Sequence, residues 1–307
     1  MRSTEILPRG VNRRRRFLFL AAGAISGAWM PARAARPVQS QVFRRSLGYG
    51  DYFEYLPRRA NTGILVLAHG SVEDERRERN VDRIAETFAR RWTGFADQHG
   101  LIVVAPAFGP SFGSWIGEPS VALGGYRALE GRAIGADDFV HRIVDQYKDR
   151  LGGGPFYLYG HSAGGQFANR YAVRHPERLK GLILSAPGRY AFPNPSAPWP
   201  YGQKQVTAHA RSGGPPHVVK PDPEGWIKAA ALPITVVVGA ADTEPQQPLR
   251  ADHPGSTRID YARAWVDAMN GLAPQGKSRI RLVVVPGVGH SSSRLTPTCQ
   301  EALAEML

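Results

Sequence analysis

The chain is poor in cysteine and in the motifs that bind cofactors. Its 307 residues include one cysteine, Cys299, so no disulfide can form within the chain. The sequence has no P-loop, no glycine fingerprint for a dinucleotide and no Cys/His spacing typical of a zinc site. Its basic residues are not interleaved with aromatic ones, so the positive charge does not indicate nucleic-acid binding. We therefore predict no cofactor, no bound metal and no nucleic-acid partner.

A long hydrophobic run is also missing. The apolar stretch near the N-terminus, residues 19–30, is too short to span about 30 Å of hydrocarbon comfortably. It follows Arg13–Arg16 and precedes Pro31-Ala32-Arg33-Ala34, which is the order of charged region, apolar core and A-x-A site in a signal peptide. We predict that residues 1–34 are a signal peptide cleaved after Ala34, and that the protein has no stable membrane anchor.

The signal peptide also indicates a route and a compartment. Arg14-Arg15-Arg16-Phe17-Leu18 resembles the R-R-x-F-L signal read by the twin-arginine export machinery, which we expect as the partner of the precursor. The mature chain would then be periplasmic or extracellular. Residues 1–34 carry +6 of the formal net charge of +13, which leaves +7 on the mature chain. Such a surplus suits solubility or contact with a weakly anionic polymer or envelope surface.

A serine stands where a strand is predicted to turn into a helix. The apolar run 155–159 leads into Gly160-His161-Ser162-Ala163-Gly164, and a helix-like segment continues to Arg174. Strand, G-x-S-x-G and helix form the context of a nucleophile elbow, in which the serine hydroxyl projects above the sheet edge. We predict that Ser162 is a nucleophile. A second match around Ser111 lacks the following helix and is predicted to be a surface loop.

A serine needs a base, and the base needs an acid to hold its tautomer. Residues 232–239 are predicted to form a buried strand followed by Asp242, and residues 279–286 form the next one, followed by His290. The order Ser, acid, His, each beyond a strand end, predicts Asp242 as the acid and His290 as the base. Glu244 lies close enough to Asp242 to remain an alternative acid.

The motifs together resemble those of the α/β-hydrolase superfamily. The resemblance runs from about Phe43 to the C-terminus and is carried by His69-Gly70, Gly160–Gly164, Gly239–Asp242 and Pro286–His290. Within the superfamily the serine region is similar to secreted bacterial serine esterases related to polyhydroxyalkanoate depolymerases and feruloyl esterases. Those enzymes often carry disulfides, which this chain cannot form.

The resemblance implies a fold and an activity. The expected fold is α/β, with a mostly parallel central sheet, helices on both faces and a loop-rich cap. The expected activity is hydrolysis of a small-molecule or polymeric carboxylic ester through an acyl-enzyme on Ser162. An amide or peptide hydrolase with the same three residues, or a non-catalytic binding module on the same fold, remains an alternative.

The resemblance also implies an oxyanion hole. In this superfamily one amide comes from the residue after the nucleophile, here Ala163. The second comes from the loop after an early strand, which we assign to Ser71, with Gly70 as the near alternative. His69 is expected to support that loop, and His161 is expected to orient or pack rather than act as the base.

We predict a single domain over residues 35–307. Strands are expected at 41–47, 52–56, 64–69, 101–105, 156–160, 181–185, 232–239 and 279–286, and helices at 80–98, 134–150, 163–174 and 257–270. Residues 187–228 are rich in Pro, Gly and aromatic side chains, which predicts the cap. Trp199 and Tyr201 in it, and Trp115 in another loop, are weak candidates for substrate contact.

Overall fold

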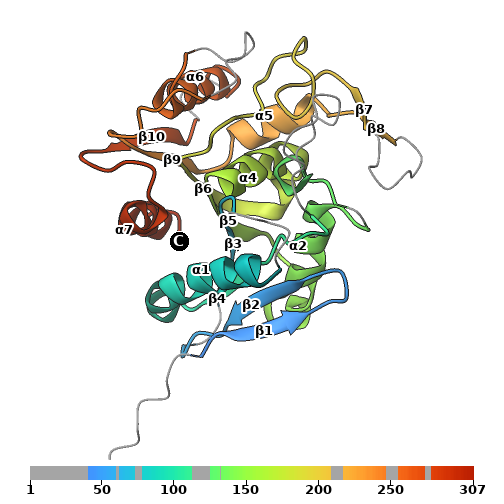
Figure 1. Ribbon diagram of the computed structural model, residues 1–307, viewed down its shortest axis with the longest axis vertical. Helices are drawn as coiled ribbons and strands as arrows, with labels where there is room; N and C mark the ends of the chain where they lie inside the picture. The colour runs from blue at the N-terminus through green and yellow to red at the C-terminus, as the bar shows by residue number, and fades with distance from the viewer. Residues whose placement is uncertain are drawn as a thin grey trace, which may run out of the picture. The chain divides into compact units, whose positions relative to one another are not determined.

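A mostly parallel eight-stranded sheet forms the centre of the fold (Figure 1). The computed structural model describes residues 41–59, 62–72, 78–112, 125–131, 133–208, 217–246, 255–273 and 278–307. The order in the sheet is β1-β2-β4-β3-β5-β6-β9-β10. Its strands are β1 (Phe43–Ser46), β2 (Asp51–Tyr55), β3 (Gly63–Ala68), β4 (Leu101–Pro106), β5 (Phe156–His161), β6 (Leu179–Ser185), β9 (Ile234–Gly239) and β10 (Ile280–Val285).

The two ends of the sheet differ. β1 and β2 form an antiparallel pair, and β2 joins β4 antiparallel, while every pair from β4 to β10 is parallel. Of the parallel strands, β3, β4, β5 and β9 are short apolar runs buried on both faces, which is the pattern expected when helices cover both sides of a sheet, while the edge strand β10 is partly exposed.

Helices cover the two faces in two groups (Figure 1). One face is covered by α1 (Glu78–His99) and α7 (Ser292–Ala304). The other is covered by α2 (Ala136–Asp145), α4 (Ala163–Arg174), α5 (Glu224–Ala230) and α6 (Arg258–Asn270). Alternate residues along β3 supply the two cores, since Leu65 and Leu67 belong to the first and Ile64 and Val66 to the second. The α/β-hydrolase architecture predicted from the sequence is therefore confirmed.

The strand register brings several strand ends to one edge of the sheet. Ala68 of β3 pairs with Gly160 of β5, and His161 pairs with Ser185 of β6. At the other side Gly239 of β9 pairs with Val285 of β10. Since these strands are parallel, the loops that follow them emerge together, which is where ligands bind in open α/β sheets.

Two helices differ from their predictions. The helix predicted over 134–150 is divided into α2 and a short α3 (Lys148–Leu151), although the predicted stripe of Phe139, Ile143, Val144 and Tyr147 is buried. Helix α7 was not predicted, because Pro297 and many polar residues obscure its pattern. Its buried face includes Leu295, Cys299 and Leu303.

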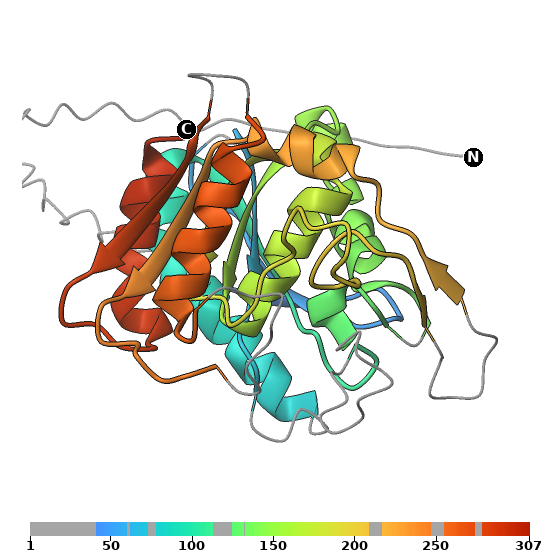
Figure 2. The same cartoon turned by 90° about the horizontal axis from the view of Figure 1, so that it is seen from above.

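Loops make up most of the described part of the segment 187–228, where the sequence predicts a cap (Figure 2). Its described part contains a small hairpin, β7 (Val206–Ala208) with β8 (His217–Val219), and the start of α5. The indole N–H groups of Trp226 and Trp265 both donate to the carbonyl oxygen of Ala191, at 3.0 and 2.9 Å. Tyr190 is fully buried as well. The aromatic side chains of this segment mainly fill the core beneath it.

The described residues also form two short 3₁₀ helices: η1 (Gly125–Ala128) follows β4 in the chain, and η2 (Pro176–Arg178) links α4 to β6. The predicted signal peptide, residues 1–34, lies outside the described residues. Across the ranges that are described, no helix is both long enough and apolar enough to cross a membrane.

Candidate active site

Ser162 occupies a strained turn between β5 and α4. Its backbone has φ 54° and ψ −113°, in the left-handed half of conformational space that side chains other than glycine rarely adopt. The turn is held on both sides: the Ser162 amide donates to the carbonyl oxygen of Ser185 at 2.8 Å, and its own carbonyl accepts from the Gln166 amide at 3.0 Å. Strain held in place by surrounding bonds is typical of a functional position.

The glycines of the motif are required by close packing. A Cβ on Gly160 would lie 2.2 Å from the carbonyl oxygen of Gly164. A Cβ on Gly164 would lie 2.1 Å from the carbonyl oxygen of Ala68 at the end of β3. Both distances are far below van der Waals contact, so the first turn of α4 can approach β3 and β5 only without these side chains.

Ser162, His290 and Asp242 form a continuous hydrogen-bonded chain. Ser162 Oγ lies 2.9 Å from Nε2 of His290, and Nδ1 of His290 lies 2.8 Å from Oδ2 of Asp242. Since an ionised carboxylate only accepts, Nδ1 carries the proton, and Nε2 is left to accept from the serine hydroxyl. The Asp242 side chain is 2% exposed and that of His290 is 32% exposed, so the chain runs from the interior to the surface.

Backbone hydrogen bonds between two loops set the positions of Asp242 and His290. The amides of Ala240 and Ala241, which precede Asp242, donate to the carbonyl oxygens of Val285 and Val288, at 2.8 and 2.9 Å. These acceptors belong to the strand and loop that lead to His290. The two loops are therefore bound to each other before their side chains meet.

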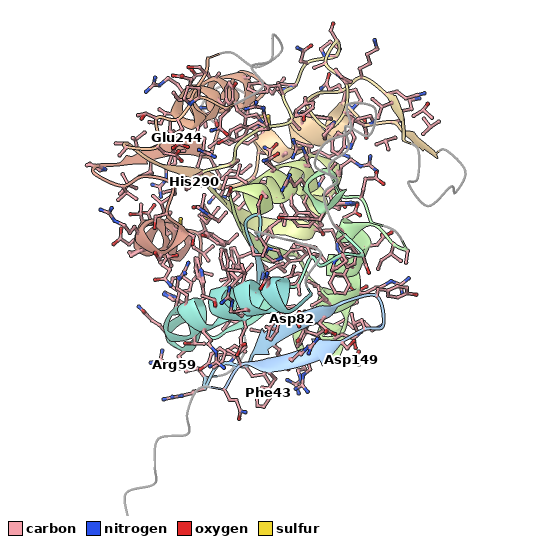
Figure 3. The ribbon with its side chains drawn as sticks, viewed as in Figure 1. Phe43, Arg59, Asp82, Asp149, Glu244 and His290 are labelled. Atoms are coloured by element: carbon pink, nitrogen blue, oxygen red, sulfur yellow. The ribbon has the colours of Figure 1, made fainter. Side chains whose placement is uncertain are left out.

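The competing residues lie elsewhere. Glu244 is exposed, and the carboxylate that contacts His290 is that of Asp242. Figure 3 shows Glu244 and His290 in the same region of the molecule, near β9 and β10, and a single residue, Thr243, separates Glu244 from Asp242. Ser111 lies in an exposed turn after β4.

The loop after β3 passes beside the elbow. A Cβ on Gly70 would lie 3.5 Å from the Cβ of Ser162. His69 supports this loop: its Nδ1 donates to the Gly70 carbonyl at 2.7 Å, and its Nε2 accepts from the Phe108 amide at 3.1 Å. Burial lowers the pKa of His69 to about 4, so the ring stays neutral near pH 7.

The two residues assigned to the oxyanion hole both border this turn. Ala163 is the first residue of α4, where amides have no acceptor within the helix. Ser71 follows Gly70, and its hydroxyl oxygen accepts from Nη2 of Arg127 at 2.7 Å. Arg127, from η1, was not identified from the sequence, because nothing in the chain predicts the contact.

His161 packs against the proposed base. Its ring and that of His290 are nearly parallel, with centroids 5.0 Å apart and planes at 29°. Nδ1 of His161 lies 3.0 Å from the hydroxyl of Ser185. Burial, together with the charge of His290, lowers the pKa of His161 to about 3, so it is a neutral packing group.

Of the predicted substrate-contact residues, Trp199 lies at the far end of α4 from Ser162. Trp199 is 1% exposed and lies under the guanidinium of Arg174, 5.7 Å from the ring centroid. Arg174 ends α4, about 18 Å along the helix from Ser162 at 1.5 Å per residue. Tyr201 is half-buried beneath Arg170, and Trp115 lies outside the described residues.

In the part of the chain that is described, no three His, Cys, Asp or Glu side chains are placed to hold a metal ion.

Known proteins share this fold. A family model described as "alpha/beta hydrolase fold" matches residues 131–208. The (lyso)-N-acylphosphatidylethanolamine lipase of Bos taurus is 32% identical over 98 residues, which are 32% of this chain and 22% of that protein. The matched segment thus spans about a fifth of that relative's length.

Solved structures match nearly the whole described domain. The poly(3-hydroxybutyrate) depolymerase of Bordetella parapertussis has a TM-score of 0.62 at 22% identity, over 86% of this chain and 90% of that one. Poly(aspartic acid) hydrolase-1 of Sphingomonas sp. KT-1 has a TM-score of 0.61 at 20% identity, over 85% of this chain and 97% of that one. The chain has the α/β-hydrolase fold, and it resembles bacterial esterases and depolymerases in that fold.

Proposed function

We propose that this protein is a serine hydrolase that cleaves carboxylic esters through an acyl-enzyme on Ser162. The observation that carries the proposal is the chain of hydrogen bonds from the strained Ser162 through His290 to the buried Asp242. Three groups with this order and these distances support the assignment of an activated nucleophile, since the base could take the serine proton as the oxygen attacks.

The proposed reaction has two halves. Ser162 Oγ attacks the acyl carbon while His290 Nε2 takes its proton, and the same proton then passes to the departing alcohol. Water next attacks the acyl-enzyme with His290 again as base, which releases the acid and restores Ser162. The amides of Ser71 and Ala163 would stabilise the oxyanion in both halves, and removal of one such donor typically costs about 10²–10³ in kcat.

The decisive experiment compares two serines. The purified protein is assayed with p-nitrophenyl esters of graded chain length and treated with a fluorophosphonate probe. Ser162→Ala should lose nearly all turnover and all labelling while remaining folded, whereas Ser111→Ala, the matched control, should behave as wild type. Labelling at Ser111, or unchanged turnover in Ser162→Ala, would overturn the assignment.

The same assay decides between ester and amide substrates. Parallel p-nitroanilides carry the same acyl groups with an amide leaving group. Faster turnover of the anilides would favour an amide or peptide hydrolase, and a folded protein with neither turnover nor labelling would favour a binding module. A film of an aliphatic polyester tests for a polymeric substrate.

We also propose that the precursor is exported by the twin-arginine route and acts in the periplasm or outside the cell. The support is the order of Arg14-Arg15-Arg16-Phe17-Leu18, an apolar core and an A-x-A site in the sequence. N-terminal sequencing of the exported protein should begin at Ala35, and recovery of the intact precursor from the cytoplasm alone would contradict export.

A further inference from the structure

Besides Ser162, His290 and Asp242, a fourth side chain belongs to this hydrogen-bonded chain. It is that of Arg258, the first residue of α6, which binds Asp242. Thr257 caps this helix: its hydroxyl accepts from the Asp260 amide at 3.2 Å, and the Asp260 carboxylate accepts from the Thr257 amide at 2.9 Å. This reciprocal capping box fixes where the helix begins. It therefore fixes the point from which the side chain of Arg258 extends.

Arg258 and His290 each bind a different oxygen of the Asp242 carboxylate. Nη1 of Arg258 donates to Oδ1 at 2.7 Å, while Nδ1 of His290 lies 2.8 Å from Oδ2. The Arg258 side chain is 14% exposed and that of Asp242 is 2% exposed. A charge-assisted hydrogen bond so shielded from water is stronger than an ion pair at the surface.

The position of Arg258 runs against the preference of a helix start. The first turn of a helix is its positive end, where aspartate and glutamate are favoured and a cation is not. Arg258 begins α6 nevertheless, and its side chain turns back to a carboxylate 16 residues earlier in the chain. The contact with Asp242 compensates for this placement.

We propose that Arg258 is a positioning residue for the reaction at Ser162, which holds the Asp242 carboxylate ionised and turned so that Oδ2 faces His290. The inference rests on the proposed function, because it gives Asp242 the role of the acid. With Oδ1 bound to Arg258, the carboxylate cannot rotate about its axis without breaking a short charged hydrogen bond. His290 is thereby kept in the tautomer that leaves Nε2 free for Ser162.

The electrostatics of the site support this role. Burial raises the pKa of Asp242, but the hydrogen bond from His290 and the charge of Arg258 outweigh it, and the pKa lies below its ordinary range. The groups facing Asp242 are His290 from the loop after β10, Arg258 from α6 and the neutral His161 from the end of β5. Without Arg258, the Asp242–His290 pair would hold its proton more tightly, since a positive charge beside it is gone.

The test uses three variants of two arginines on α6. Arg258→Met keeps the length of the stem, Arg258→Lys keeps the charge, and Arg263→Met changes an exposed arginine of the same helix as the control. Arg258→Met should lower kcat about tenfold or more with KM within about twofold, because a hydrogen bond to a charged group is lost. In the pH profile of kcat/KM for Arg258→Met, the acid limb should move to higher pH. Arg258→Lys should recover most of the rate, and Arg263→Met should match the wild type.

A double variant separates positioning from a structural role. In the Asp242→Asn background the carboxylate through which Arg258 acts is gone, so Arg258→Met should cost less than about threefold there. An equal loss in both backgrounds, or an acid limb that does not move, would overturn the proposal. If Arg258→Met does not fold, Arg258→Gln, which retains a neutral donor, takes its place in the same comparison.

Labelling of Ser162 keeps the two proposals distinguishable. The fluorophosphonate should label Ser162 in the wild type and label it more slowly in Arg258→Met. Equal rates in the two proteins would overturn the role of Arg258 while leaving the proposed function intact. No labelling of the wild type would overturn the proposed function and the role of Arg258 with it.

Discussion

The imidazole rings of His161 and His290 lie nearly parallel, with their centroids 5.0 Å apart. His161 belongs to the buried end of β5, and His290 to a loop that reaches the surface. A neutral ring is thus packed against one that must accept a proton in the proposed reaction. Protonation of both rings would place two cations face to face, so the burial of His161 matters for stability as well as for packing.

The first prediction is loss of stability in mild acid. His69 and His161 have pKa values of about 4 and about 3 in the folded protein, against 6.5 when unfolded. Below pH 6.5 the unfolded chain takes up protons that the folded chain does not, so the free energy of unfolding falls as pH falls. Each ring contributes up to about 1.4 kcal/mol per pH unit until its folded pKa is reached.

Urea unfolding between pH 8 and pH 4 measures this effect. His161→Phe keeps a ring at the position but cannot take up a proton. The slope of its free energy of unfolding against pH should therefore be smaller than that of the wild type, by the amount that corresponds to about one proton. At pH 8 both rings are neutral in either state, and there the variant should lose only the hydrogen bond to Ser185. An unchanged slope in the variant would show that His161 is not held neutral.

The second prediction concerns the glycine after the elbow. Gly164→Ala would place a methyl group 2.1 Å from the carbonyl oxygen of Ala68. The first turn of α4 must then move away from β3, at a cost of about 3 kcal/mol or more and with loss of turnover. Thermal melting and the ester assay report the two effects.

Gly94→Ala is the matched control. Gly94 lies inside α1 with nothing within 4 Å of an added Cβ. The same substitution should there stabilise the protein by about 1 kcal/mol, because alanine is the better helix former. A Gly164→Ala protein with normal melting temperature and activity would mean that the elbow is looser than these distances indicate.

The strand-turn-helix around Ser162 was predictable because each part has a local signal. The apolar run, the two glycines and the stop before Pro176 all lie within about twenty residues. The choice between Asp242 and Glu244 had a weaker signal, the position of Asp242 three residues after Gly239. It is made by the amides of Ala240 and Ala241, which bind the loop that leads to His290, and these bonds join segments far apart in the sequence.

The contact of Arg258 with Asp242 is a second example of a long-range contact that the sequence does not predict. The Thr257–Asp260 capping box is a local pattern, so the start of α6 could be placed closely. The ion-pair partner of Arg258 could not be predicted, because it depends on how α6 packs beside β9. The burial of Tyr190 and Trp226 in the segment 187–228 could not be predicted for a related reason, because it depends on how this segment packs against distant parts of the chain.

The third prediction concerns export of the precursor. Changing Arg14 and Arg15 to Lys together keeps the charge but removes the pair that a twin-arginine receptor reads. The precursor should then accumulate in the cytoplasm, as judged by fractionation and immunoblotting. Changing Arg2 and Arg9 to Lys alters two arginines outside the motif and should leave export normal. Normal export of the Arg14/Arg15 variant would instead indicate the general secretory route.

The last prediction concerns the acid. Asp242→Asn leaves His290 without a partner that fixes its tautomer, so kcat should fall by roughly 10³–10⁴ with little change in KM. Turnover should recover partly at high pH, where hydroxide can replace the missing base. Glu244→Gln removes a carboxylate that is exposed two residues further on, and it should cost less than about tenfold. Both variants should melt within a few degrees of the wild type, so that the rates can be compared. If Glu244→Gln instead lost most of its turnover and Asp242→Asn kept it, the loop would turn the Glu244 carboxylate toward His290 in solution.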